Sequence, residues 1–273
     1  MKRKLTATFA LAISMMLAMT ACSKAPEQEK SQNDNPSVTE TDKDNAKSDT
    51  ESEDILDKKE FEKNFNEQNQ TLQNVHFQFD GDYLFFGTQS YVKLDSLYFY
   101  DPQTLENTAY YVKLHTKDPK KENSGETIHI SPGGHYVKWE GEKDWTKGTS
   151  EGDLIDYHGF SNILQKIMRE DPYELKKTES GYEVLVNDKN FDLLGTFKGE
   201  LDFWLKGIDQ TEVDKEVIFL IDEETFYIKE ISVDMNHQAN DVKTIKTHTK
   251  IIATEHNQVD LKMLEKIYAE AEQ

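Results

Sequence analysis

The chain lacks the cysteines from which a disulfide framework is built. It has one cysteine among 273 residues, Cys22, and only six prolines. A single cysteine excludes any disulfide within the chain, so the fold must be held by its hydrophobic core. If the chain is exported, the lack of disulfides suits an envelope that has no oxidising periplasm, which predicts a Gram-positive host.

Positive charge is also scarce. The chain carries 32 lysine and arginine residues against 52 aspartate and glutamate residues, a net charge of −20. This excess argues against nucleic acid as a partner and against binding to anionic lipid headgroups. Solubility in a polyanionic cell wall explains the acidic surface, while binding of calcium or of a cationic peptide stays open as an alternative.

Long apolar runs are absent except at the N-terminus. The basic residues Lys2, Arg3 and Lys4 precede an uncharged segment, Leu5–Met19. A bilayer-spanning helix needs about 20 apolar residues, so this segment is too short to be one. A basic start, a short apolar core and small residues after it are typical of a secretory signal.

The residues before Cys22 indicate how this signal is removed. Thr20 and Ala21 are small, and the stretch resembles a bacterial lipobox, although Met19 stands where leucine is usual. We expect residues 1–21 to be a lipoprotein signal peptide and the Cys22 thiol to carry diacylglycerol, with a further acyl chain such as palmitate on its amino group. Two acyl chains anchor a protein stably. The alternative is cleavage after Ala25, which would release a free secreted protein.

A polar segment follows the cysteine. Between residues 23 and 53 the only aliphatic side chains are those of Ala25, Val38 and Ala46. Such a segment buries too little apolar surface to offset the entropy of ordering, so residues 22–53 are predicted to be a disordered acidic and polar tether. Its root-mean-square span is roughly 30 Å. Residues 54–273 are then one domain.

Apolar periodicity predicts that this domain is rich in antiparallel strands. Alternating apolar residues predict strands or hairpins over 75–79, 91–116, 126–147, 173–187, 215–235 and 242–256. The stretch "FDGDY", Phe79–Tyr83, is interpreted as a hairpin turn. Along the segment 215–235 the apolar parity changes between Ile228 and Ile231, which predicts a β-bulge there.

Three segments have helical periodicity: 55–68, 160–168 and 259–272. The middle one is the clearest, because its apolar residues recur at i, i+3, i+4, i+7 and i+8. We call this set the apolar stripe: Phe160, Ile163, Leu164, Ile167 and Met168. Pro172 is expected to end this helix. The fold class is thus α+β, a large curved antiparallel sheet (a half-barrel) with helices packed on its concave face.

Two short motifs carry a resemblance to a known family. One is a strand–turn–strand pattern formed by Leu220, Ile221, Asp222, Thr225, Ile228, Lys229 and Ile231, and the other is the segment 136–147, "YVKWEGEKDWTK". With the order of helices and strands, they resemble the LolA/LppX-like half-barrel lipoproteins, a group with many Gram-positive members. The resemblance implies an apolar ligand beneath the helix, lodged against the sheet. The C-terminal helix departs from the LolA-type carriers, and a lipid anchor counts against transport between two membranes.

Patterns typical of catalysis are missing. Ser161 has Gly159 at −2 but Ile163 at +2, so it does not form a nucleophile elbow. His129 and His135 flank a "SPGG" turn and could approach each other, yet the sequence indicates no further metal ligands. We therefore expect neither an enzyme nor a metal or cofactor site.

Aromatic residues on consecutive predicted strands are the remaining candidates for a site. We take Tyr98, Tyr110 and Trp139, together with the apolar stripe, as the tentative lining of a cavity under the sheet. Ordinary sheet packing is the alternative explanation for these rings. The expected function is that of a membrane-anchored extracytoplasmic lipoprotein that binds a lipid-like ligand. The alternative is an envelope protein-interaction or sensory module without a small ligand.

Overall fold

The computed structural model describes residues 57–148, 155–170, 173–201, 205, 207–238 and 244–273. The predicted signal peptide, the lipidation site at Cys22 and the predicted tether lie outside the described residues, as does Pro172.

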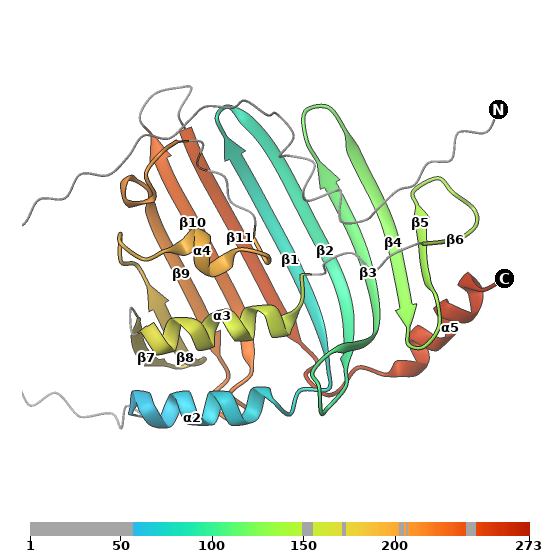
Figure 1. The fold of residues 1–273 in the computed structure, drawn as a ribbon, viewed down its shortest axis with the longest axis horizontal. Helices are drawn as coiled ribbons and strands as arrows, with labels where there is room; N and C mark the ends of the chain where they lie inside the picture. Colours follow the sequence, from blue (N-terminus) through green and yellow to red (C-terminus); the bar gives the residue numbers. More distant parts are fainter. Residues whose placement is uncertain (1–56, 149–154, 171–172, 202–204, 206, 239–243) are drawn as a thin grey trace, which may run out of the picture.

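The core of the fold is one open sheet of eleven strands in the order β6-β5-β4-β3-β2-β1-β11-β10-β9-β8-β7 (Figure 1). All neighbouring strands run antiparallel, and β1 lies in the centre because it pairs with both β2 and β11. The strands are β1 Asn74–Phe85, β2 Thr88–Tyr100, β3 Asn107–Lys117, β4 Glu122–Ile130, β5 His135–Trp139, β6 Thr146–Lys147, β7 Glu174–Thr178, β8 Gly181–Val186, β9 Asp214–Ile221, β10 Ile228–Gln238 and β11 Thr244–Thr254.

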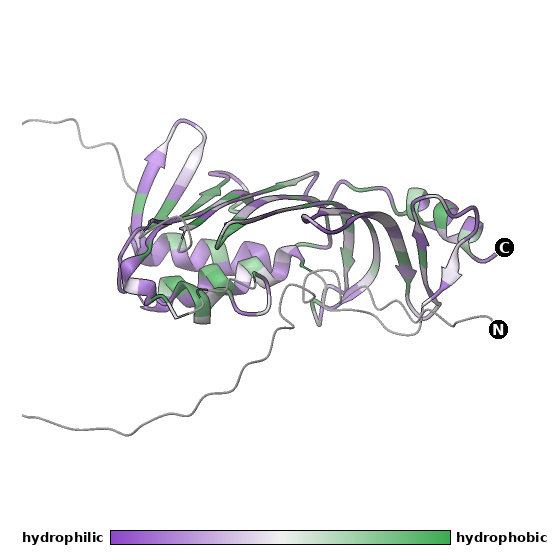
Figure 2. Cartoon of the chain, turned by 90° about the horizontal axis from the view of Figure 1, so that it is seen from above, coloured by the Kyte–Doolittle hydropathy of each residue, from purple (hydrophilic) through white to green (hydrophobic). Residues whose placement is uncertain are grey.

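Helices lie on both faces of this curved sheet (Figure 2). The helices are α2 Lys58–Asn69, α3 Tyr157–Glu170, α4 Leu193–Phe197 and α5 Leu261–Ala271, and a short 3₁₀ helix spans Gln210–Glu212. Helices α2, α3 and α4 contribute to one large core with the concave face, as predicted. Helix α5 differs from that prediction: its Leu264 and Ala271 pack on Tyr111 and Ile128, on the opposite face of β3 and β4.

The prediction of a turn at "FDGDY" was wrong. Strand β1 runs without interruption through this stretch, and the hairpin turn lies at Phe86 and Gly87, both with positive φ (53° and 78°). The ring of Tyr83 folds over Gly81, so a Cβ atom at position 81 would force this ring to move. Asp80 faces the outer side, where its carboxylate lies 3.6 Å from the Lys93 ammonium group.

The β9–β10 hairpin confirms the predicted bulge and explains its sequence motif. The pairing register shifts between Ile228 and Glu230, as the apolar parity indicated. In the preceding turn, Asp222 Oδ1 accepts hydrogen bonds from the backbone N–H groups of Glu224 and Thr225 and from the Thr225 hydroxyl. The aspartate and the threonine of the motif therefore hold the turn together.

Replacing Asp222 by alanine is expected to lower the free energy of unfolding by about 1–2 kcal/mol at pH 7, because backbone donors lose their acceptor. Partial burial raises the pKa of Asp222, but the hydrogen bonds from Thr225 and Glu224 outweigh it and hold this pKa below its usual range. Because the pKa of Asp222 is lower in the folded state, its stabilisation is fully present at a pH above the unfolded-state pKa. The stabilisation is lost as the pH falls through the folded-state pKa. Urea unfolding of wild type and Asp222→Ala should thus differ at pH 7 and converge in strong acid. Asp222→Asn keeps Oδ1 and serves as the control; equal losses for both variants would contradict this role.

Candidate functional site

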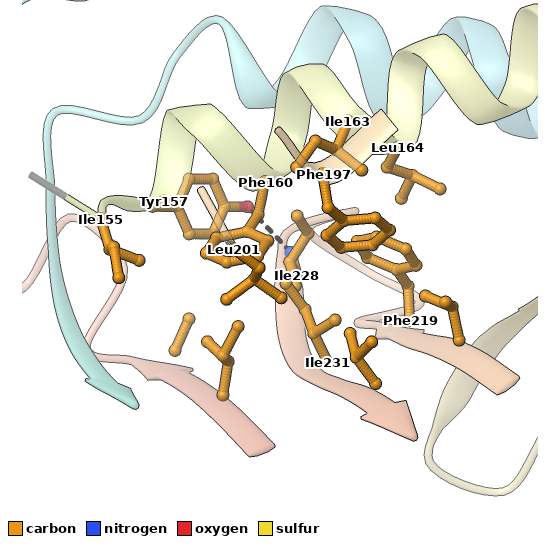
Figure 3. Close-up of a cluster of buried hydrophobic side chains, with 14 of the residues drawn as sticks. Ile155, Tyr157, Phe160, Ile163, Leu164, Phe197, Leu201, Phe219, Ile228 and Ile231 are labelled. Atoms are coloured by element: carbon orange, nitrogen blue, oxygen red, sulfur yellow. Dashed lines mark hydrogen bonds between the residues drawn. The ribbon is translucent and has the colours of Figure 1, made fainter. Parts of the chain in front are cut away.

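The apolar stripe of α3 faces the sheet, as predicted. Its five side chains are between 0 and 6% exposed. The Phe160 ring lies between two other rings. Its centroid is 5.9 Å from that of Phe77 of β1 and 6.4 Å from that of Phe197 of α4. Figure 3 shows Phe160 and Leu164 of the stripe on the side of α3 that faces Phe219, Ile228 and Ile231 of β9 and β10. The stripe therefore covers the half of the concave face formed by β1 and β9–β11.

The first turn of α3 is fixed by a buried polar network that the stripe analysis missed. Tyr157 Oη donates a hydrogen bond to Asn69 Oδ1 of α2. It also accepts one from the backbone N–H of Ile228, which Figure 3 shows as a dashed line. Asn69 Nδ2 in turn donates to the backbone oxygens of Phe65 and Phe226, both at 2.8 Å. Tyr157 stands three residues before Phe160, so extending the stripe by one turn would have identified it.

The other half of the concave face is formed by β2–β5. Of the helices in the described part of the chain, none lies over β3, β4 or β5 on this side (Figure 1). Side chains paired across these strands form a buried surface that we call the β2–β5 wall: Leu94, Ser96, Val112, Leu114, Thr127 and Val137. These residues are smaller than the phenylalanines of β1 and β9. Four of them are aliphatic, and Ser96 and Thr127 each carry a buried hydroxyl group.

Next to the wall, along the strand ends nearest α3, runs a row of rings with polar tips. We call it the aromatic row: Tyr100, Tyr98, Tyr110, His129 and His135. The Tyr98 ring centroid lies 6.3 Å from that of Tyr100 and 6.5 Å from that of Tyr110, which stacks on His129 at 5.4 Å. Tyr98 Oη donates a 2.8 Å hydrogen bond to the backbone oxygen of Ile155, just before α3. Burial raises the pKa of Tyr98, so this ring stays neutral.

The structure brings some of the predicted site residues together and separates others. The Tyr98 ring contacts the rings of Tyr110 and Phe77, and its centroid lies 6.1 Å from that of Phe77. Phe77 in turn contacts Phe160 of the stripe. Trp139 lies on the same concave face but at the far end of the wall, paired with Gly125 and partly exposed. The predicted lining is thus two regions, one around Phe77 and one at Trp139, joined by the wall.

The described residues contain neither a cluster of metal ligands nor a membrane-spanning helix. His129 and His135 are paired across β4 and β5, so the expected approach is confirmed. Over the described ranges, no cluster of three or more His, Cys, Asp or Glu side chains is placed to hold a metal ion. In the same part of the chain, no helix combines the length and the apolar character that crossing a membrane requires.

No family model and no curated protein matches the sequence. Among solved structures, the chain is similar to LprF from Mycobacterium bovis, with 11% identity, a TM-score of 0.44 and coverage of 74% of this chain and 94% of that one. It is also similar to the lipoprotein LppX from Mycobacterium tuberculosis, with 9% identity, a TM-score of 0.37 and coverage of 73% and 94%. A lipoprotein-sorting domain from Vibrio parahaemolyticus has 6% identity, a TM-score of 0.26 and coverage of 78% and 100%. These structures include both types of protein that the sequence motifs resembled.

Proposed function

We propose that the chain is a lipid-anchored extracytoplasmic lipoprotein that binds an apolar or amphiphilic molecule against the concave face of its sheet. The observation that carries the proposal is the β2–β5 wall, a mostly apolar set of side chains on the part of the concave face over which no described helix lies. Proteins bind small apolar ligands on concave surfaces lined by apolar and aromatic side chains, with few polar groups. The aromatic row supplies those polar groups at one end.

The anchor in this proposal is the lipid on Cys22, and Cys22→Ala tests it. The variant is expected to appear in the culture medium, or to accumulate as uncleaved precursor, because the thioether to diacylglycerol cannot form. Western blots of membrane and medium fractions measure the distribution. Ser23→Ala, next to the lipidated position, is the control and should stay in the membrane fraction. A mature-sized Cys22→Ala protein that remains with the membrane would exclude the anchor.

Ligand binding is tested by a larger side chain in the wall. Val112→Trp is expected to weaken the binding of a fluorescent fatty-acid probe at least tenfold, because the indole occupies the surface on which the acyl chain would lie. The control is Lys113→Trp, which adds an indole to the same strand on its outer face. Mass spectrometry of an organic extract of the purified protein provides an independent test. If the wild type binds no probe and repeated extracts contain no lipid, the proposal fails.

One observation favours the alternative of a protein-interaction module. Within the described residues, Leu261 and Met263 are the exposed large hydrophobic side chains, at 39% and 53% exposure, and both lie at the start of α5. Exposed apolar residues on a helix are a frequent feature of interaction surfaces. Leu261→Glu with Met263→Glu should leave lipid binding unchanged and would abolish partner binding if this alternative holds.

A further inference from the structure

The central strand β1 has a gap in its row of side chains on the concave face. This row consists of Val75, Phe77, Phe79, Gly81 and Tyr83, and Gly81 adds no side chain to it. A glycine inside a strand often marks a place where another group approaches the backbone closely. Here that group is the ring of Tyr83, whose hydroxyl end lies against the position that a Cβ atom of Gly81 would take.

Small side chains flank this gap on both neighbouring strands. Gly81 pairs with Val92 of β2 and with Thr249 of β11, and both residues are buried. Val92 stands next to Leu94 of the wall on the same face of β2. Without the Tyr83 ring, the surface of the wall would therefore continue across β1 to β11 at the height of these small side chains.

Two contacts hold the Tyr83 ring over Gly81. The Thr249 hydroxyl donates a 3.2 Å hydrogen bond to Tyr83 Oη. The Phe85 ring lies nearly parallel to the Tyr83 ring, with 6.2 Å between the centroids and 10° between the planes. Burial raises the pKa of Tyr83 to about 12, so the ring is uncharged at pH 7 and can lie against an apolar chain. The ring closes the β1 end of the wall.

The opposite end of the wall has a similar arrangement. Gly125 of β4 pairs with Trp139 of β5, and the Trp139 ring lies over it. Between the two covered glycines, β2 and β3 form the concave face, where Leu94 pairs with Leu114. Three strand spacings separate β1 from β4, a distance of about 14 Å. An extended chain advances about 1.2 Å per bond, so this distance matches roughly twelve carbon atoms.

We propose that Tyr83 limits the length of the apolar chain that binds on the β2–β5 wall. The chain lies across β2 and β3, with its polar end at the β5 side, where Trp139 is partly exposed, and its tail at Tyr83. This proposal rests on the proposed function and narrows its ligand class to chains of about twelve carbons. A longer chain would have to displace the Tyr83 ring, so Tyr83 determines specificity for length.

The test measures how affinity depends on chain length. Saturated fatty acids from octanoate to stearate compete with the apolar dye N-phenyl-1-naphthylamine for residues 23–273, which include every described residue. For the wild type, affinity should rise with each added carbon up to about laurate and change little beyond it, because further methylene groups stay in water. Tyr83→Ala should extend this limit by one strand spacing, about four carbons, and raise the affinity for palmitate at least tenfold.

Two variants serve as controls. Tyr83→Phe keeps the ring and should keep the wild-type limit. Tyr91→Ala removes a tyrosine from the outer face of β2 and should leave all affinities unchanged. Circular dichroism checks that each variant folds. If Tyr83→Ala does not fold, Tyr83→Leu, whose side chain is shorter than tyrosine, should still move the limit toward longer chains.

Two results would overturn the length limit and leave the proposed function in place. One is a wild-type affinity that rises steadily up to stearate. The other is the same limit in the wild type and in the folded Tyr83→Ala or Tyr83→Leu variant. If the dye does not bind, or no fatty acid displaces it, the proposed function itself fails and the length limit fails with it.

Discussion

Replacing Phe160 by alanine is expected to lower the free energy of unfolding by about 3–5 kcal/mol, the range for removing a fully buried phenylalanine. The ring is 0% exposed and packs between Phe77 of the sheet and Phe197 of α4. Rings that belong to three different elements cannot all move to fill the space, so the cavity should persist. Urea denaturation followed by tryptophan fluorescence or circular dichroism measures the loss.

Asn162→Ala, at an exposed position of the same helix, is the control and should change stability by less than about 0.5 kcal/mol. The same experiment distinguishes a core helix from a lid over a ligand. A lid would leave space beneath the stripe, so Phe160→Ala would cost well under 3 kcal/mol and would alter probe binding. A large loss of stability with unchanged probe binding places the ligand on the β2–β5 wall and away from α3.

The elements of this fold were predictable because strands and helices repeat with different periods. Alternation predicted the hairpin within residues 91–116, and its apolar residues Val92, Leu94, Val112 and Leu114 lie in one buried cluster. The bulge near Ile228 was predictable for the same reason, since a change of parity has few other causes. Periodicity depends only on residues that are neighbours in the sequence, so strands and helices could be predicted without knowing the tertiary contacts.

The errors concern contacts between distant segments. "FDGDY" has the composition of a turn, but Gly81 leaves space for the Tyr83 ring, and β1 pairs with β11 without interruption through this stretch. The apolar residues of α5 predict that one face is buried, but they carry no information on which side of the sheet it packs. Tertiary contacts decided both outcomes.

Trp139 and Tyr110, which the sequence analysis took as candidate lining of a cavity, lie on the concave face of the sheet. Whether they contact a ligand stays a prediction.

Tyr157→Phe is expected to lower the free energy of unfolding by about 2–4 kcal/mol, although it removes a single oxygen atom. Tyr157 is 1% exposed and Asn69 is 2% exposed. Without the hydroxyl, the backbone N–H of Ile228 loses its acceptor and Asn69 Oδ1 loses its donor. A buried group left unpaired costs about 1–3 kcal/mol, and here two are left. Thermal or urea unfolding measures the difference from wild type.

A double-mutant cycle with Asn69→Ala then shows that the two residues act as one unit. Residues in one hydrogen-bond network couple, so the double variant should lose far less than the sum of the two single losses. Tyr91→Phe removes a hydroxyl at a partly exposed site, where Oη lies 3.4 Å from Asp80, and should cost less than about 0.5 kcal/mol. Additive losses, or a Tyr157→Phe variant as stable as Tyr91→Phe, would contradict the network. Because the network joins α2, α3 and the bulged start of β10, its loss should also loosen the first turn of α3.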